Sequence, residues 1–181
     1  MKLIQRLAQK KAPIVERWLD LIFETYPADA QRFLRKQKDR FANPVGTTIS
    51  KEIENLYVEL IEGLEPEKVT PRLDRIIRIR AIQDFFPSQA IAFVFLLKKA
   101  IRDEMQNEIL ENQLSQELST FESRIDDLAL LAFDIYMNCR EKLYDIRVNE
   151  TKKQMSRLLQ KTGMIHEIPI HKSSLKNGNK T

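Results

Sequence analysis

The stretch that decides the fold is Pro87-Ser88-Gln89-Ala90-Ile91-Ala92-Phe93-Val94-Phe95-Leu96-Leu97-Lys98-Lys99. Residues 90–97 are apolar without interruption, so this segment must be enclosed either by other elements or by lipid. It is too short to cross a bilayer, which needs about 20 apolar residues. We therefore expect 87–105 to be the central helix of a helical domain, with Pro87 in its first turn and Ser88 as its N-cap.

The composition of the 181-residue chain favours an all-α fold, a helical bundle. Four glycines accompany many Leu, Ile, Glu, Lys, Arg and Gln residues, whose side chains lose little rotamer freedom in a helix. No segment alternates apolar and polar residues for long with β-branched enrichment, so we expect no sheet. The 30 basic residues are interleaved with 26 acidic ones and give a net charge of +4, which argues against nucleic-acid binding through a concentrated basic face.

Catalytic and metal-binding residue types are scarce outside the C-terminal end. Both histidines, His166 and His171, lie near that end, so residues 1–160 contain no His to bind haem or zinc or to act as a general base. We expect no enzyme activity, no cofactor and no metal. Cys139 is the sole cysteine, and the N-terminus lacks the apolar run of a signal peptide, which together predict a cytoplasmic protein.

Apolar spacing and turn residues place the other helices. The predicted helices cover residues 2–11, 13–25, a segment from Pro27, about 47–62, about 71–84, 87–105 and about 111–160. Gly63 is the expected stop of the helix at 47–62. Pro66 and the pair Thr70-Pro71 are typical of successive helix starts, with Thr70 as an N-cap.

The segment from about 111 to 160 contains no Pro or Gly and predicts one long helix that leaves the body. Its apolar residues follow alternating steps of four and three, which is a heptad pattern. The apolar face widens at four positions, and we expect this portion to pack inside the domain: Leu130, Leu131, Phe133 and Met137.

Beyond Tyr144 the same helix becomes strongly charged and keeps only a thin apolar seam. The seam consists of Val148, Met155, Leu158 and Leu159. A thin seam on a projecting helix suits pairing with a second copy, so we expect a homodimer. Gly163 is the expected end of the helix, and residues 161–181 predict a flexible basic tail beside the domain formed by 1–160.

The helix predicted at about 71–84 carries four arginines. Spacing by three places Arg72, Arg75 and Arg78 roughly on one face, with Arg80 nearby. These arginines could receive a phosphate, a partner's carboxylates, or internal acids such as Asp74 and Asp84. A solvated face with internal ion pairs is the alternative. The connection 38–46 could dock on the body or cover a pocket, and two of its residues are further candidates for partner binding. The candidate partner-binding residues are Arg72, Arg75, Arg78, Arg80, Phe41 and Asn43.

A rival hypothesis is a small-molecule sensor with an apolar pocket. Its candidate lining residues are Trp18, Phe85, Phe86, Phe93 and Phe133. Large aromatic side chains are most simply core residues, and Trp18 is most simply an anchor between helices. Both roles remain open at this point.

Several of these stretches together resemble the N-terminal domain of RsbRD-type co-antagonists, regulators of the stressosome partner-switching system. The resembling pieces are Trp18 with 25–30, Phe33-Leu34, 38–46, 73–85, 87–98, 121–126, 132–137 and 139–141. The resemblance spans about residues 10–155. It implies an all-α sensory or docking module that works by protein–protein contact.

Domains of this family are typically joined through an exiting helix to an output domain, and related stressosome sensors are similar to haem-free globins. The resemblance therefore implies a globin-like bundle without haem. After the exiting helix this sequence offers 18 further residues, so we expect a stand-alone copy that lacks the STAS domain. Such copies look like those encoded beside sulfite-reduction membrane complexes, which implies an accessory role there as an alternative.

Overall fold

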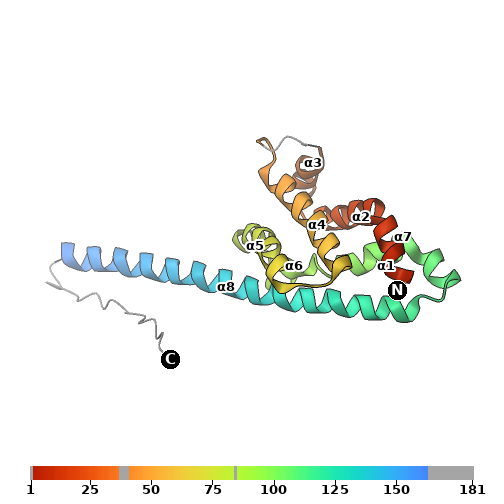
Figure 1. The fold of residues 1–181 in the computed structure, drawn as a ribbon. Helices are drawn as coiled ribbons and strands as arrows, with labels where there is room; N and C mark the ends of the chain where they lie inside the picture. Colours follow the sequence, from red (N-terminus) through yellow and green to blue (C-terminus); the bar gives the residue numbers. More distant parts are fainter. Residues whose placement is uncertain (1, 37–40, 84, 163–181) are drawn as a thin grey trace, which may run out of the picture. The chain divides into compact units, whose positions relative to one another are not determined.

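The computed structural model describes residues 2–36, 41–83 and 85–162, and this part of the chain is helical without a strand. The chain divides into two compact units, residues 1–140 and residues 141–181. The helices, shown in Figure 1, are α1 (Lys2–Gln9), α2 (Lys11–Glu24), α3 (Ala28–Lys36), α4 (Pro44–Glu62), α5 (Pro66–Ile82), α6 (Pro87–Ala92), α7 (Leu96–Glu111) and α8 (Ser115–Lys161). The predicted all-α helical bundle is confirmed.

Helices α1 to α7 and the first part of α8 pack together in the unit formed by residues 1–140. The closest pairs are α4 with α5 and α2 with α7, and α8 runs beside the others along one side of this unit (Figure 1). The buried apolar side chains of these helices form one continuous core. Its largest fully buried members include Trp18, Tyr57, Phe93 and Phe121.

Helix α2 ends where the sequence predicts, whereas α1 ends two residues before the predicted end at 11. Helix α2 carries Pro13 in its first turn, where a missing N–H is harmless. It ends at Glu24, and the backbone N–H of Thr25 donates to the carbonyl of Ile22 at 3.1 Å. Proline at position 27 disfavours helical geometry at Tyr26, so the chain turns there.

Helix α4 begins at Pro44, three residues earlier than the predicted start at 47. The reason is Asn43, whose side-chain oxygen accepts a hydrogen bond from the backbone N–H of Gly46 at 2.8 Å. Its amide nitrogen donates to the carbonyl of Leu34 at 3.1 Å, which ties the cap to α3. At the other end Gly63 has φ +132° and stops the helix, as predicted.

Helix α5 is a single helix from Pro66, although the sequence suggested separate starts at Pro66 and at Thr70-Pro71. Pro71 lies inside it and removes only one backbone donor. Residues 66–82 therefore form one continuous helix, and its apolar residues Leu73, Ile76 and Ile77 are buried.

The predicted central helix at 87–105 is two helices, α6 and α7, with a break at residues 93–95. In the break the backbone hydrogen bonds join residues three apart and not four: the N–H of Leu97 donates to the carbonyl of Val94 at 3.2 Å. The carbonyl of Phe93 is thereby released, and the indole N–H of Trp18 donates to it at 2.7 Å. A distant side chain therefore stabilises the break, which no local pattern indicates.

The start of α6 also differs from the prediction in one detail. Pro87 is its first residue, as expected, but Ser88 is the second residue and not the N-cap. The side-chain oxygen of Gln89 instead accepts from the backbone N–H of Phe86 at 3.0 Å.

Helix α8 starts at Ser115, after a break in which Gln113 has φ +52°, and not at 111. Its buried side chains in residues 1–140 include Leu128, Ala132 and Ile135, which define the inner face. At 100° per residue, Leu130, Phe133 and Met137 fall on the opposite face. The prediction that these three pack inside is wrong, because they are 67%, 46% and 41% exposed; Leu131 is half-buried.

In the unit formed by residues 141–181, the described part is the second portion of α8, and none of its side chains is buried. The predicted helix stop at Gly163, the tail and both histidines lie outside the described residues. A domain boundary near residue 160 stays a prediction.

Candidate functional site

Two of the four arginines in α5 bind acids of the neighbouring helix α4. Arg72 Nη2 lies 2.8 Å from Glu59 Oε1, and Arg75 Nη1 lies 2.7 Å from Glu52 Oε1. Glu52 is only 3% exposed, and its second oxygen has no hydrogen-bond donor among the described residues. These two arginines therefore join α4 to α5, which is the ion-pair alternative that the sequence left open.

Arg78 forms an ion pair within its own helix, with 2.6 Å between its Nε and Asp74 Oδ2. The neighbouring carboxylate raises the pKa of the Arg78 guanidinium. The side chains of Arg75 and Arg78 remain more than half exposed, whereas that of Arg72 is mostly covered. Of the predicted ladder, only Arg75 and Arg78 present a guanidinium to solvent.

Arg80 is 1% exposed and lies in the core, away from the other three arginines. Its Nε donates to the carbonyl of Ala90 at 3.1 Å, and its Nη2 donates to the carbonyl of Gln89 at 3.0 Å. The remaining donors reach the hydroxyls of Tyr26 at 3.3 Å and Thr25 at 3.4 Å. The structure thus places Arg80 as a buried connector of α5 to α6 and to the end of α2.

Aromatic rings surround this guanidinium. Its carbon lies 4.3 Å from the centre of the Phe85 ring, 5.4 Å from that of Tyr26 and 5.7 Å from that of Phe93. These distances allow cation–π attraction, which is stronger away from water. Burial lowers the pKa of Arg80, and the Tyr26 hydroxyl partly opposes that effect. We call this group, Arg80 with Tyr26, Phe85 and Phe93, the Arg80 cluster.

The five aromatic residues proposed to line a pocket fall into two groups. Phe85 and Phe93 belong to the Arg80 cluster, and Trp18 is buried beside the carbonyl of Phe93. Phe86 is 72% exposed and Phe133 is on the outer side of α8. The structure therefore brings three of the five together as core and leaves two on the surface.

The two candidates from the connection 38–46 also have different environments. Phe41 is 94% exposed. Asn43 is buried as the N-cap of α4 and holds that helix to α3.

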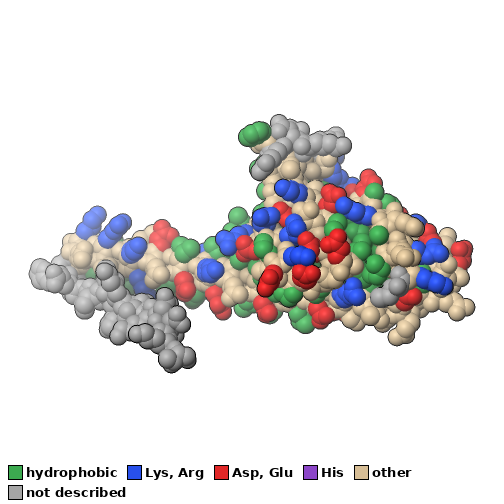
Figure 2. All heavy atoms as spheres, in the orientation of Figure 1, with side chains coloured by type: hydrophobic (Ala, Val, Ile, Leu, Met, Phe, Trp, Pro, Cys, Tyr) green, Lys and Arg blue, Asp and Glu red, His purple; other side chains and the backbone are tan. Residues whose placement is uncertain are grey.

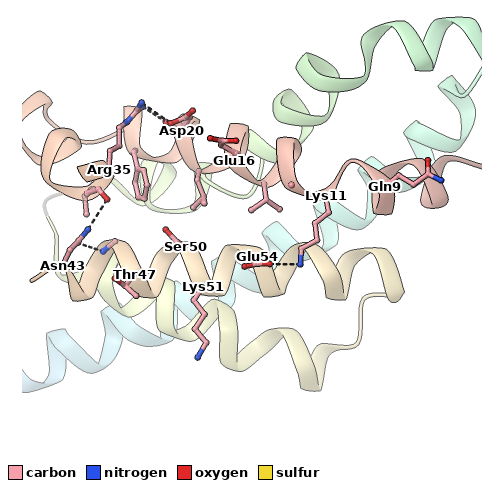
Figure 3. A pocket seen from close by; sticks show the side chains of 16 residues that line it. Gln9, Lys11, Glu16, Asp20, Arg35, Asn43, Thr47, Ser50, Lys51 and Glu54 are labelled. Atoms are coloured by element: carbon pink, nitrogen blue, oxygen red, sulfur yellow. Dashed lines mark hydrogen bonds and ion pairs between the residues drawn. The ribbon is translucent and has the colours of Figure 1, made fainter. Parts of the chain in front are cut away.

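A groove of about 1000 Å³ runs between α2 and α4, with α3 at one end (Figure 3). Its floor is apolar and includes Val15, Leu19, Phe23 and Leu34. Ion pairs lie at both ends: Lys11 Nζ is 2.7 Å from Glu54 Oε1, and Arg35 Nη1 is 3.1 Å from Asp20 Oδ1. Sequence reasoning missed this groove, because it depends on how far α2 and α4 diverge.

The outer side of α8 forms a second unpartnered surface in residues 1–140. Leu130, Phe133 and Met137 lie there in steps of three and four, and we call them the outer face of α8. Elsewhere the surface mixes charges: Figure 2 shows acidic and basic side chains interspersed over the side in view. The outer face of α8 is therefore one of several places where large apolar side chains are exposed, and it gathers three of them on one helix.

Sequence reasoning also missed Glu52 and Glu59, the partners of Arg75 and Arg72. The sequence does contain a pattern that could have indicated them: these two acids are seven residues apart and border the apolar face of α4. Among the described residues, no group of three or more His, Cys, Asp or Glu side chains gathers as metal ligands do. Within the same residues, no helix combines the length and the apolar character that a membrane span needs.

Comparison with known proteins identifies relatives by sequence. The chain is similar to a protein of Archaeoglobus fulgidus described as an uncharacterized protein, with 23% identity over 147 residues, 78% of this chain and 85% of the relative. No solved structure matches the chain, so the globin likeness stays a prediction. The family described as RsbT co-antagonist protein rsbRD N-terminal domain matches residues 12–150. The chain therefore belongs to the RsbRD N-terminal domain family.

Proposed function

We propose that this chain is a cytoplasmic, non-enzymatic signalling domain of the stressosome co-antagonist type that acts by binding other proteins. The family match over residues 12–150 supports a signalling role. The observation that carries the proposal is the outer face of α8, where three large apolar side chains are exposed on a long helix. An exposed apolar stripe of this kind favours a protein contact.

The first contact that we propose is a homodimer through the outer face of α8. Its apolar residues continue in sequence as Tyr144, Val148, Met155 and Leu158, in the heptad spacing that suits helix pairing. Replacing Phe133 and Met137 by Glu should weaken self-association at least about tenfold, because buried apolar area would be replaced by like charges. Sedimentation equilibrium of the full chain measures this.

The matched control is Asn138→Glu, which adds a charge one residue away and off the outer face. Circular dichroism of each variant checks that the fold is retained. A wild-type chain that is monomeric at high concentration would remove the dimer from the proposal.

The second contact that we propose is a partner surface that includes Arg75 and Arg78, and Phe41 stays a separate candidate for partner binding. Both guanidinium groups remain exposed after pairing with internal acids, and they favour a partner with carboxylates or phosphate. We expect the double variant Arg75→Ala/Arg78→Ala to lose partners that in-cell cross-linking captures with the wild-type chain. Lys99→Ala is the control, because Lys99 is exposed on α7 and lies in no ion pair of the described residues. Unchanged capture would exclude this surface.

A small-molecule sensor is the second candidate function, and the groove between α2 and α4 supports it. Its apolar floor and charged ends suit an amphipathic ligand. Native mass spectrometry of freshly purified protein tests this. A co-purifying ligand that is lost in Leu19→Glu favours the sensor, and a mass equal to that of the bare chain counts against it.

A further inference from the structure

Arg140, on α8, contacts the end of α5. Its Nη1 donates to the carbonyl of Ala81 at 3.3 Å, and both residues belong to the unit formed by residues 1–140. Ala81 follows Arg78 by three residues, so the two are neighbours on the surface of α5. Cys139, the residue before Arg140, also lies close enough to Arg78 to help raise the pKa of its guanidinium. Arg140 therefore borders the surface that carries Arg75 and Arg78.

No acid among the described residues balances the charge of Arg140. Arg75 pairs with Glu52 and Arg78 pairs with Asp74, so each of these ion pairs is neutral as a whole. Arg140 is exposed and bonds a backbone carbonyl in the last turn of α5, which carries only a partial negative charge. The net positive charge of this surface therefore comes from Arg140.

Each of the three guanidinium groups keeps donors for a partner. A guanidinium carries five N–H donors and can bind a carboxylate through two of them in parallel. Within the described residues, one nitrogen of each group is engaged: Nη1 of Arg75, Nε of Arg78 and Nη1 of Arg140. The remaining nitrogens of each group are therefore available to carboxylates of another molecule.

An exposed apolar side chain lies beside these donors. Ile82 is 73% exposed and follows Arg75 and Arg78 in steps of three and four, so the three lie along one side of α5. A single exposed isoleucine is ordinary on a protein surface. This one comes directly after the residue that Arg140 contacts, so a partner that covers it also meets guanidinium groups.

We propose that Arg140 anchors an acidic segment of a partner protein on a surface that consists of Arg75, Arg78, Ile82 and Arg140. The segment places carboxylates on the guanidinium groups and an apolar side chain on Ile82. This inference rests on the second contact of the proposed function, and it adds the anchor and the class of partner. A nucleic acid fits this surface less well, because Asp74 lies among the arginines and repels a continuous row of phosphates.

Selection of displayed peptides on the full wild-type chain tests the class of partner. We expect the enriched peptides to carry Asp and Glu around an apolar residue, and fluorescence anisotropy measures their affinity. Enrichment of neutral or basic peptides, or no enrichment, would overturn the inference. A labelled single-stranded oligonucleotide that binds more tightly than the peptides, and that Arg140→Gln weakens, would assign the surface to nucleic acid instead.

Substitutions locate the binding on this surface. Arg140→Gln should weaken the acidic peptides about threefold and make their affinity less dependent on salt, because an exposed charge is lost. Arg140→Lys retains the charge and should recover most of the affinity. Ile82→Ser should weaken binding several-fold and leave its salt dependence unchanged. The matched control is Arg32→Gln, because Arg32 is exposed on α3 and lies in no ion pair of the described residues.

The outcomes separate this inference from the proposed function. If Arg75→Ala/Arg78→Ala abolishes peptide binding and Arg140→Gln leaves it unchanged, the proposed surface remains and the anchor is wrong. If the double variant also binds like the wild type, the proposed surface itself is wrong. Urea unfolding and sedimentation check that fold and self-association are unchanged in each variant, since Arg140 contacts α5 and lies seven residues after Phe133.

Discussion

Arg80 joins three stretches of the chain by polar contacts. Its guanidinium, on α5, bonds two carbonyls of α6 and two hydroxyls at the end of α2. A buried charge is costly unless its donors are satisfied, and here four acceptors and three rings supply the compensation.

Replacing Arg80 by Lys should destabilise the protein by about 2–4 kcal/mol, because an ammonium cannot reach four acceptors in a planar arrangement. Urea unfolding followed by circular dichroism measures the change. Arg78→Lys is the matched control on the same helix, and we expect no measurable change from it because its ion pair is exposed. Equal midpoints for both variants would contradict the assigned role of Arg80.

Tyr57 makes stability depend on pH in the alkaline range. It is fully buried and donates to the carbonyl of Leu7 at 3.0 Å, and burial raises the pKa of its hydroxyl. The folded state therefore holds this proton more tightly than the unfolded state, so the free energy of unfolding falls as pH rises above about 10.

The variant Tyr57→Phe separates this effect from other titrations. At neutral pH it should cost about 1 kcal/mol for the lost hydrogen bond, and above pH 10 its stability should fall less steeply than that of the wild type. Urea unfolding at a series of pH values checks both parts. Parallel pH profiles would show that Tyr57 does not control this dependence.

At the level of the helix, sequence patterns predicted most elements, because apolar spacing and proline or glycine act locally. Gly63 and the Tyr26-Pro27 pair ended their helices as expected. The break at residues 93–95 could not be predicted, since it depends on a hydrogen bond from Trp18, 75 residues away. The outward position of Phe133 and Met137 was also missed, because an apolar side chain does not indicate which face its helix buries.

The same limit applies to the candidate site. The spacing of Arg72, Arg75 and Arg78 correctly indicated a common helix and left internal pairing open, but not that α4 supplies the acids. Arg80 follows Arg78 by only two residues. At 100° per residue, that step is enough to turn its side chain to the other side of the helix and into the core. Local spacing therefore identified the charged helix and could not select its exposed members.

Replacing Trp18 by Phe tests the break between α6 and α7. The carbonyl of Phe93 would lose its donor inside the core, which should cost about 1–3 kcal/mol. Thermal and urea unfolding measure the loss, and Tyr144→Phe, at an exposed site, is the control. A variant as stable as the wild type would show that the break does not need the indole.

The contact between α4 and α5 can be measured by a double-mutant cycle with Glu52→Gln and Arg75→Ala. Because Glu52 is buried and its Oε1 lies 2.7 Å from Arg75, we expect a coupling energy of about 1 kcal/mol. Urea unfolding of the two single variants and the double variant gives the value. Additive effects would mean that the ion pair contributes little and that α4 and α5 are held by their apolar residues.

At the scale of the whole molecule, hydrogen exchange should distinguish the two parts of α8. In residues 118–136 the helix is held by buried side chains, so its amides should exchange slowly. In residues 144–158 no side chain is buried, so exchange should be fast in dilute protein. Protection of 144–158 that grows with protein concentration would accompany dimer formation, and concentration-independent exchange would argue against it.

The Arg80 cluster has a consequence for how the molecule assembles. Dehydrating a guanidinium is unfavourable until its acceptors and rings are all in place, and these come from three separate stretches of the chain. An intermediate in which only two of these stretches surround the guanidinium would dehydrate it without supplying all of its acceptors and rings. We therefore infer that α2, α5 and α6 join in a single cooperative event, so that half-assembled forms of this region stay rare.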